Sequence, residues 1–230
     1  MKYVIGNWKS QQNLTESLVW LDHLHSLRPT FNQETKVILC LPFTDIASFN
    51  EKLSTLNLPI HTGAQNVSHL PSGKHTGEIT ADMLRELVTH CLVGHSERRR
   101  DFHETCEEVA LKSKHLLDSG VTPIVCLDLP YFDEQVRELF EHDVDVSRCI
   151  FVFEPISAIG TGHPIDPDFA NQVAHQISFL IDNQAPILYG GSVTADNAPE
   201  FVHENRIDGV LVGTDSLNPT LFSNIISSLS

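Results

Sequence analysis

The feature that most constrains the fold is a regular alternation of short apolar runs with longer segments of helical pattern. The runs are rich in Val, Ile, Leu and Phe, and each ends in polar residues or glycine. Near-continuous hydrophobicity is typical of a parallel strand that is buried on both faces. The pattern predicts eight strands: Tyr3–Lys9, Lys36–Pro42, Ile60–Asn66, His90–Ser96, Thr122–Asp128, Cys149–Pro155, Ala185–Gly191 and Gly209–Thr214.

Eight strands separated by helix-length segments predict an α/β fold, a closed (β/α)8 barrel of eight parallel strands with outer helices. An open, doubly wound sheet is the alternative. The glycine fingerprint that such a sheet carries after its first strand in dinucleotide-binding proteins is absent. No low-complexity linker or shift in composition divides the chain, so we expect residues 1–230 to form one barrel domain.

Capping residues mark several of the expected helices. Asn13 precedes an apolar stripe that should end before Pro29. A second helix is predicted from about Glu104 to Asp118, with Gly120 following its end. Another should open at Asp166, where proline occupies the first turn.

Composition excludes several classes of function. The net charge of −15 argues against nucleic-acid binding, because the only basic cluster is Arg98–Arg100. No apolar run reaches the roughly 18 residues that span a bilayer, and the first residues lack the pattern of a signal peptide. The five cysteines are odd in number and lack paired spacing. We therefore expect a cytoplasmic protein with no membrane segment, disulfide framework, metal site or cofactor.

Chemically useful residues follow the predicted strands. The C-terminal ends of the strands meet at one mouth of a parallel barrel. Asn7 and Lys9 end the first predicted strand on the same face, His95 and Glu97 follow the fourth, and Glu154 follows an apolar run in the sixth. A lone lysine or histidine there is more often structural, but burying an unpaired carboxylate costs several kcal/mol. A base, an imidazole and a cation at one mouth indicate a catalytic site.

Glycine-rich turns follow the last two predicted strands. Gly190 and Gly191 precede Ser192, and Gly213 precedes Thr214. Backbone amides can approach a phosphate closely where side chains are absent, and barrels often bind phosphate after strands seven and eight. These turns therefore predict a phosphate site, although the net charge of the whole chain is negative.

Several segments resemble the signature segments of triosephosphate isomerase, and they occur in the order of that family from the first strand to the last. They are Gly6–Lys9, Gly63–Val67, Thr76–Glu78, Val93–Arg99, Glu154–Pro155, Ala158–Gly162 and Tyr189–Val193. The resemblance implies the interconversion of dihydroxyacetone phosphate and D-glyceraldehyde 3-phosphate through an enediolate, a glycolytic reaction.

The resemblance also implies roles for individual residues. Glu154 would be the base and His95 the electrophile, a pairing typical of the family. Lys9 would stabilise the enediolate, Asn7 would orient the substrate and Glu97 would hold the polar network. The phosphate would be bound by residues of three loops, Gly160, Ser192, Gly213 and Thr214.

Two longer segments acquire roles by the same resemblance. Ile156–His163 would be a lid that shields the enediolate. The segment Gln65–Glu78, which we call the arm, would insert into a second subunit, with Thr76 reaching the neighbouring site. The resemblance therefore implies a homodimer.

Departures from the family pattern concern the lid and the phosphate loop. Ser157, Phe153 and Leu129 stand where the family usually has tryptophan, tyrosine and glutamate, which suggests an altered lid hinge. The stretch from Asp128 to Cys149 is short, so the helix within it should be truncated. Thr214 replaces a glycine, and it would be strained if this position required a positive φ.

Two other functions remain open on the sequence alone. Another sugar-phosphate barrel, such as a pentose-phosphate epimerase, would use the same phosphate loops but would give no reason for Lys9 or His95. A catalytically impaired barrel that acts as a binding protein would fit the hinge departures. Such a protein has no need of a buried base opposite a cation.

Overall fold

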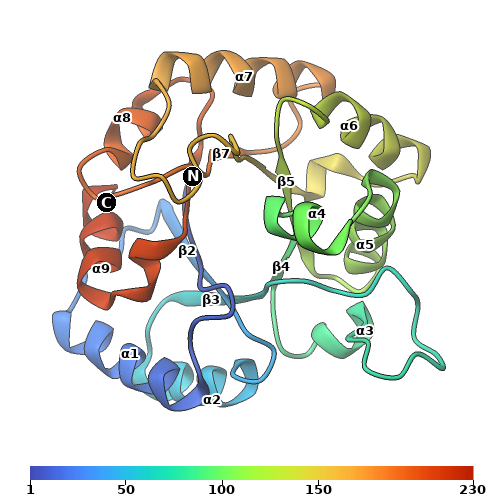
Figure 1. Ribbon diagram of the computed structural model, residues 1–230. Helices are drawn as coiled ribbons and strands as arrows, with labels where there is room; N and C mark the ends of the chain where they lie inside the picture. The colour runs from blue at the N-terminus through green and yellow to red at the C-terminus, as the bar shows by residue number, and fades with distance from the viewer. Residues whose placement is uncertain (230) are drawn as a thin grey trace.

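The computed structural model describes residues 1–229, in which eight parallel strands close into a barrel (Figure 1). The strands pair in chain order, and the last pairs with the first through Tyr3 and Gly209. The predicted (β/α)8 architecture is therefore confirmed. The strands are β1 (Lys2–Asn7), β2 (Thr35–Leu41), β3 (Ile60–Ala64), β4 (His90–Val93), β5 (Thr122–Leu127), β6 (Ile150–Phe153), β7 (Ile187–Tyr189) and β8 (Gly209–Val212).

The predicted strands extended too far toward their C-terminal ends, by one to three residues each. Lys9, Ser96 and Pro155, for example, lie beyond the ladders. Side-chain alternation continues past the last interstrand hydrogen bond, so the pattern alone does not show where a strand ends. The consequence is that the candidate catalytic residues lie at strand ends or in the loops that follow.

The connecting helices surround the strands as an outer layer (Figure 1). They are α1 (Leu14–Leu27), α2 (Ile46–Leu56), α3 (Ala81–Leu84), α4 (Ser96–Phe102), α5 (Cys106–Asp118), α6 (Phe132–Glu141), α7 (Pro167–Leu180), α8 (Ala198–His203) and α9 (Pro219–Ser228). Two short 3-10 helices, η1 (Val146–Arg148) and η2 (Thr214–Leu217), complete the connections.

The predicted helix boundaries agree with the observed caps. Asn13 forms a capping box at the start of α1, and Asp166 caps α7 with Pro167 in the first turn. The start of α5 differs from the prediction: Thr105 caps the helix, and Glu104 lies before it with its side chain buried. As expected, α6 is short, with 10 residues against 13 in α5 and 14 in α7.

The core has two apolar compartments that follow from the two faces of each strand. Side chains such as Ile5, Ile38 and Val152 fill the barrel interior, and a larger cluster lies between the strands and the helices. Trp8 belongs to the larger cluster, and its indole N–H donates to the carbonyl of Ser216 at 3.1 Å. This bond joins the end of β1 to η2, and so brings two parts of the barrel mouth together.

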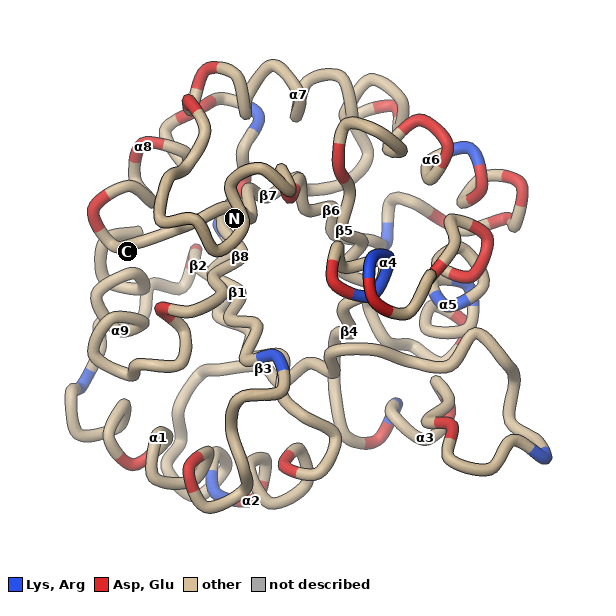
Figure 2. Tube along the Cα trace, viewed as in Figure 1, with Lys and Arg blue, Asp and Glu red and all other residues tan. Residues whose placement is uncertain are grey.

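Acidic side chains predominate on the outer helices. Figure 2 shows Lys and Arg dispersed singly or in short groups among the Asp and Glu, with no continuous basic track. Within residues 1–229, none of the helices has the length and apolar character that crossing a bilayer requires.

Candidate active site

A cavity of about 310 Å³ opens at the C-terminal ends of the strands. It brings together eight of the nine residues predicted for the site, all except Glu97. The cavity is lined by Asn7, Lys9, His95, Glu154, Ile159, Gly160, Gly162, Gly190, Ser192, Val193, Thr194, Leu211, Gly213, Thr214 and Asp215. Segments widely separated along the chain therefore converge at one mouth, as the barrel topology requires.

Glu154 and His95 face each other at the base of the cavity. Glu154 follows β6 and is 3% exposed, and His95 follows β4 and is 5% exposed. The Oε1 atom of Glu154 lies 3.3 Å from Nε2 of His95. The other carboxylate oxygen, Oε2, is buried without a hydrogen-bond partner among the described residues. A buried acceptor with free capacity is suited to accept a proton.

The environment keeps Glu154 ionised. Burial alone would raise the pKa of Glu154, but the charge of His95 and the hydrogen bond with it outweigh burial and lower that pKa. Lys9 contributes in the same direction. The carboxylate is thus available as a base at neutral pH.

The helix that begins after His95 fixes its tautomer. The side chain of His95 caps α4, and its Nδ1 accepts a hydrogen bond from the amide of Glu97 at 3.2 Å. Nδ1 must then carry a lone pair, so a neutral ring has its proton on Nε2, the atom that faces Glu154. The ring is therefore a donor toward the cavity.

Two influences on the protonation of His95 oppose each other. Burial lowers the pKa of His95, but the carboxylate of Glu154, assisted by Glu97, raises it above the ordinary value. The amide of Glu97 opposes protonation of His95, because the Nδ1–H of an imidazolium would point at the N–H of that amide. A substrate between Glu154 and His95 would weaken the interaction that favours the charged ring. The two carboxylates thus favour the charged ring, whereas burial and the amide of Glu97 favour the neutral one.

Lys9 is held in place by both its backbone and its side chain. Its amide donates to Oδ1 of Asn7 at 3.1 Å, and its backbone has a left-handed φ of 53°. Its ammonium group lies 2.6 Å from Oε1 of Glu97. Glu97 thus orients the cation without lining the cavity itself.

The lid, Ile156–His163, contacts the loop that follows β7. Ser192 donates to the carbonyl of Ala158 at 2.6 Å and accepts from the amide of Gly162 at 3.1 Å. Just beyond the lid, the amide of Ile165 donates to the hydroxyl of Tyr189 at 3.2 Å. These bonds hold the lid over the cavity, so the structure has the arrangement expected of a closed site.

The loops that line the cavity after β6, β7 and β8 offer backbone donors. The amides of Gly160, Ser192 and Gly213, which lie outside helices and strands, donate no hydrogen bond within residues 1–229. Thr214 begins η2, and its φ is not positive, so the strain considered for this position is absent. Sequence reasoning did not identify Asp215, which also lines the cavity. Burial raises the pKa of this carboxyl group.

The three hinge departures form no polar network with one another. Phe153 is buried in the core at the end of β6, whereas Leu129 and Ser157 are exposed. Within residues 1–229 the side chain of Ser157 makes no hydrogen bond. The first hinge of the lid must therefore be held by other residues.

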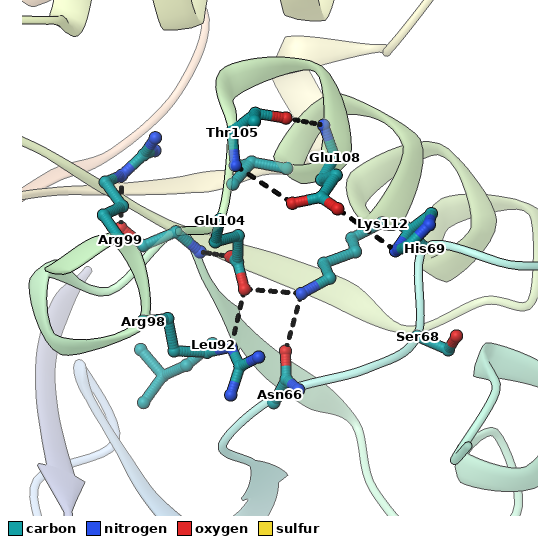
Figure 3. A network of polar contacts seen from close by, with 12 residues as sticks. Asn66, Ser68, His69, Leu92, Arg98, Arg99, Glu104, Thr105, Glu108 and Lys112 are labelled. Carbon is teal, nitrogen blue, oxygen red and sulfur yellow. Dashed lines mark hydrogen bonds and ion pairs between the residues drawn. The ribbon is translucent and has the colours of Figure 1, made fainter. Parts of the chain in front are cut away.

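A buried ionic network joins the arm to Gly94, which lies between β4 and His95 (Figure 3). The carboxylate of Glu104 accepts from the amide of Gly94 at 2.9 Å and from Arg98 and Lys112 at 2.6 Å each. Lys112 also donates to Oδ1 of Asn66 at 2.9 Å. The network fixes the base of the arm, whereas residues 71–78 beyond it are exposed.

Comparisons with known proteins agree with this geometry. The family model described as "Triosephosphate isomerase" matches residues 2–229. Similar curated proteins, each named "Triosephosphate isomerase", come from a Nostoc species (38% identity, covering 98% of both chains), Mesomycoplasma hyorhinis (33%, covering 97% of both) and Dictyoglomus thermophilum (34%, covering 99% of both). Because the match extends over nearly the whole chain, this protein belongs to the triosephosphate isomerase family of isomerases.

Proposed function

We propose that this protein interconverts dihydroxyacetone phosphate and D-glyceraldehyde 3-phosphate by proton transfer through an enediolate. The observation that carries the proposal is the buried pair of Glu154 and His95, whose facing atoms lie 3.3 Å apart beneath a closed lid. Family membership supports the reaction, and the cavity supplies the groups that the reaction needs.

Proton transfer between the two carbons is assigned to Glu154. Its carboxylate removes a proton from the carbon next to the carbonyl group and returns it to the neighbouring carbon. The unpartnered Oε2 supports this role, because a base already satisfied by two donors would bind a proton weakly. Positioned general bases typically contribute about 10²–10⁴-fold to a rate.

The two oxygens of the substrate are assigned to His95, Lys9 and Asn7. The Nε2–H of neutral His95 donates to the carbonyl oxygen as negative charge develops there, and it moves a proton between the two oxygens. The ammonium group of Lys9 stabilises the same charge, and Asn7 orients the substrate. Such donors act strongly because they are fixed before the reaction begins, and a lid closed over the substrate would shield them from water.

We assign the phosphate group to the loops that follow β6, β7 and β8. Gly160, Ser192, Gly213 and Thr214 line the cavity, and within residues 1–229 the amides of Gly160, Ser192 and Gly213 donate no hydrogen bond. We assign Glu97 to the orientation of Lys9, with which it pairs at 2.6 Å. The negative charge of the whole protein does not oppose this assignment, because the local donors determine the potential within the cavity.

We further propose a single-domain, cytoplasmic enzyme that forms a homodimer through the arm, Gln65–Glu78. The exposure of residues 71–78, including Thr76, supports this proposal, as does the buried network that fixes the base of the arm. Sedimentation velocity of the parent and of a variant without residues 71–77 tests it. A parent that sediments as a monomer at micromolar concentration would contradict the dimer.

The reaction is tested with a coupled assay on glyceraldehyde 3-phosphate, in which the parent is compared with Glu154→Gln. The amide keeps the size of the side chain but is a poor base, so we expect kcat to fall about 10²–10⁴-fold. Glu141→Gln, at the exposed end of α6, is a matched control that should retain parental activity. A folded parent without turnover, or an active Glu154→Gln variant, would refute the assignment.

A further inference from the structure

The ladder between β5 and β6 ends just before the lid, and it leaves one amide without a backbone partner. The last pair in register is Leu127 with Phe153, and the amide of Glu154 donates to the carbonyl of Leu127 at 2.8 Å. Pro155 follows and has no N–H to donate. The next donor, the amide of Ile156, is therefore the first that the ladder leaves unpaired.

The side chain of Asp128, directly after β5, accepts the hydrogen bond from this amide. Oδ2 of Asp128 accepts from the amide of Ile156 at 3.1 Å, and Oδ1 accepts from the amide of Leu129 at 2.7 Å. Asp128 is only 5% exposed, and within residues 1–229 it forms no ion pair with a lysine or arginine. Its two oxygens are thus committed to two amides, one of which belongs to the lid.

The rest of Ile156 does not hold the lid in place. Its side chain is 53% exposed, so packing contributes little to its position. The opposite end of the lid is fixed by the bonds of Gly162 with Ser192 and of Ile165 with Tyr189. The Asp128 bond is the corresponding attachment at the first end, two residues after the base Glu154.

We propose that Asp128 is a positioning residue that anchors the first hinge of the lid and, through it, the backbone that carries Glu154. The inference rests on the proposed isomerase function for its catalytic consequences but not for the anchor itself. Burial, together with the charge of Glu154, raises the pKa of Asp128, although the hydrogen bonds from the amides of Ile156 and Leu129 favour the ionised form. That form suits the role, because hydrogen bonds to a charged acceptor are about twice as strong as those between neutral groups. The exposed positions of Ser157 and Leu129 leave this task to Asp128.

Removing the Asp128 side chain should destabilise the closed lid more than it weakens substrate binding. In Asp128→Ala, we expect kcat to fall roughly tenfold, as for the loss of one charge-assisted hydrogen bond, with a smaller change in KM. A lid that opens early exposes the enediolate to water. Its electron pair can then form a C=C bond as the C–O bond to phosphate breaks, which releases inorganic phosphate and an enol that tautomerises to methylglyoxal. The ratio of methylglyoxal to isomerised product should therefore rise.

The experiment combines kinetics with amide exchange. Parent, Asp128→Asn, Asp128→Ala and the charge-matched control Asp133→Asn, on the exposed face of α6, are compared for kcat, KM and methylglyoxal formation. Hydrogen exchange of the Ile156 amide is followed by NMR on the same proteins. We expect faster exchange and more methylglyoxal in both Asp128 variants, and parental values in the control. Circular dichroism verifies folding, and the isosteric Asp128→Asn keeps the test valid if Asp128→Ala does not fold.

Two results would overturn the inference. One is unchanged Ile156 exchange and product ratio in a folded Asp128 variant. The other is a loss of kcat shared by the Asp133→Asn control. If the parent itself lacked isomerase activity, the proposed function would fail, but amide exchange would still decide whether Asp128 anchors the lid.

Discussion

A buried histidine at the opposite end of the barrel should make the stability of the protein depend on pH. His90 begins β4 and is 2% exposed. Its Nδ1 lies 2.6 Å from the hydroxyl of Thr89, and its ring is 5.9 Å from that of His61. Burial, together with the charges of Lys36 and His61, lowers the pKa of His90 from 6.5 to about 3. The folded protein therefore keeps this ring neutral at a pH where the unfolded chain protonates it.

The sign and size of the effect follow from linkage. The folded pKa lies below the unfolded value, so the unfolded state binds more protons between the two values. The contribution to stability is complete above about pH 6.5 and decreases as the pH falls toward 3. One pKa unit corresponds to about 1.4 kcal/mol. Between pH 7.5 and 5.0, this one group should lower the free energy of unfolding by about 2 kcal/mol.

Urea unfolding at the two pH values measures this contribution, with the protein concentration held constant because association also affects stability. The parent, His90→Gln and the exposed-histidine control His23→Gln are compared. We expect the drop in unfolding free energy from pH 7.5 to 5.0 to be about 2 kcal/mol smaller in His90→Gln than in the other two. An equal drop in all three proteins would refute the reasoning, because some other group would then be responsible.

Three further changes test other parts of the structure. Tyr189→Phe removes the acceptor for the amide of Ile165, so kcat/KM for glyceraldehyde 3-phosphate should fall by a factor that corresponds to about 1–3 kcal/mol; parental kinetics would contradict a role in closure. Asp215→Asn removes a negative charge from the cavity. Repulsion between a unit charge and a nearby phosphate dianion in water-like surroundings is on the order of 1 kcal/mol, so KM and the inhibition constant for inorganic phosphate should each fall about fivefold. Lys112→Met leaves the buried carboxylate of Glu104 short of a partner and should lower the free energy of unfolding by roughly 3–5 kcal/mol, measured in urea, whereas Lys114→Met on the exposed side of α5 should not.

The sequence was sufficient to predict the barrel and most of the cavity, because both depend on patterns that few alternative folds would produce. Apolar runs such as the one before Glu154 have the character of strands buried on both faces. The polar residues that end these runs, Lys9 and His95 among them, had to meet at one mouth once the strands were parallel. The observed cavity contains both.

The residues that sequence reasoning missed are acidic side chains whose environment depends on tertiary contacts. Asp128 is the last residue of a predicted strand and Asp215 follows another, where a carboxylate is ordinarily solvated. The structure buries Asp128 against two amides and places Asp215 in the cavity. In a chain with 30 acidic residues, charge alone does not distinguish these two from the others. Their partners are backbone N–H groups, which have no sequence signal.

Residues of the cavity differ from the rest of the fold in where a non-glycine residue has a positive φ. Eight non-glycine residues in the described part of the chain have a positive φ. Six of them, Arg28, Asn57, His103, Asp143, Asp182 and Asn183, lie within three residues of the end of a helix, where a left-handed residue commonly closes the last turn. The remaining two are Lys9, with φ of 53°, and Ser192, with φ of 49°, and both line the cavity. An unfavourable conformation of a non-glycine residue persists where the surrounding structure imposes it, and here Asn7 and Glu97 hold Lys9 while two lid contacts hold Ser192. Lys9 and Ser192 are therefore the two residues whose positive φ is not explained by the end of a helix. Lys9 presents its ammonium group to the cavity, and Ser192 presents its backbone amide.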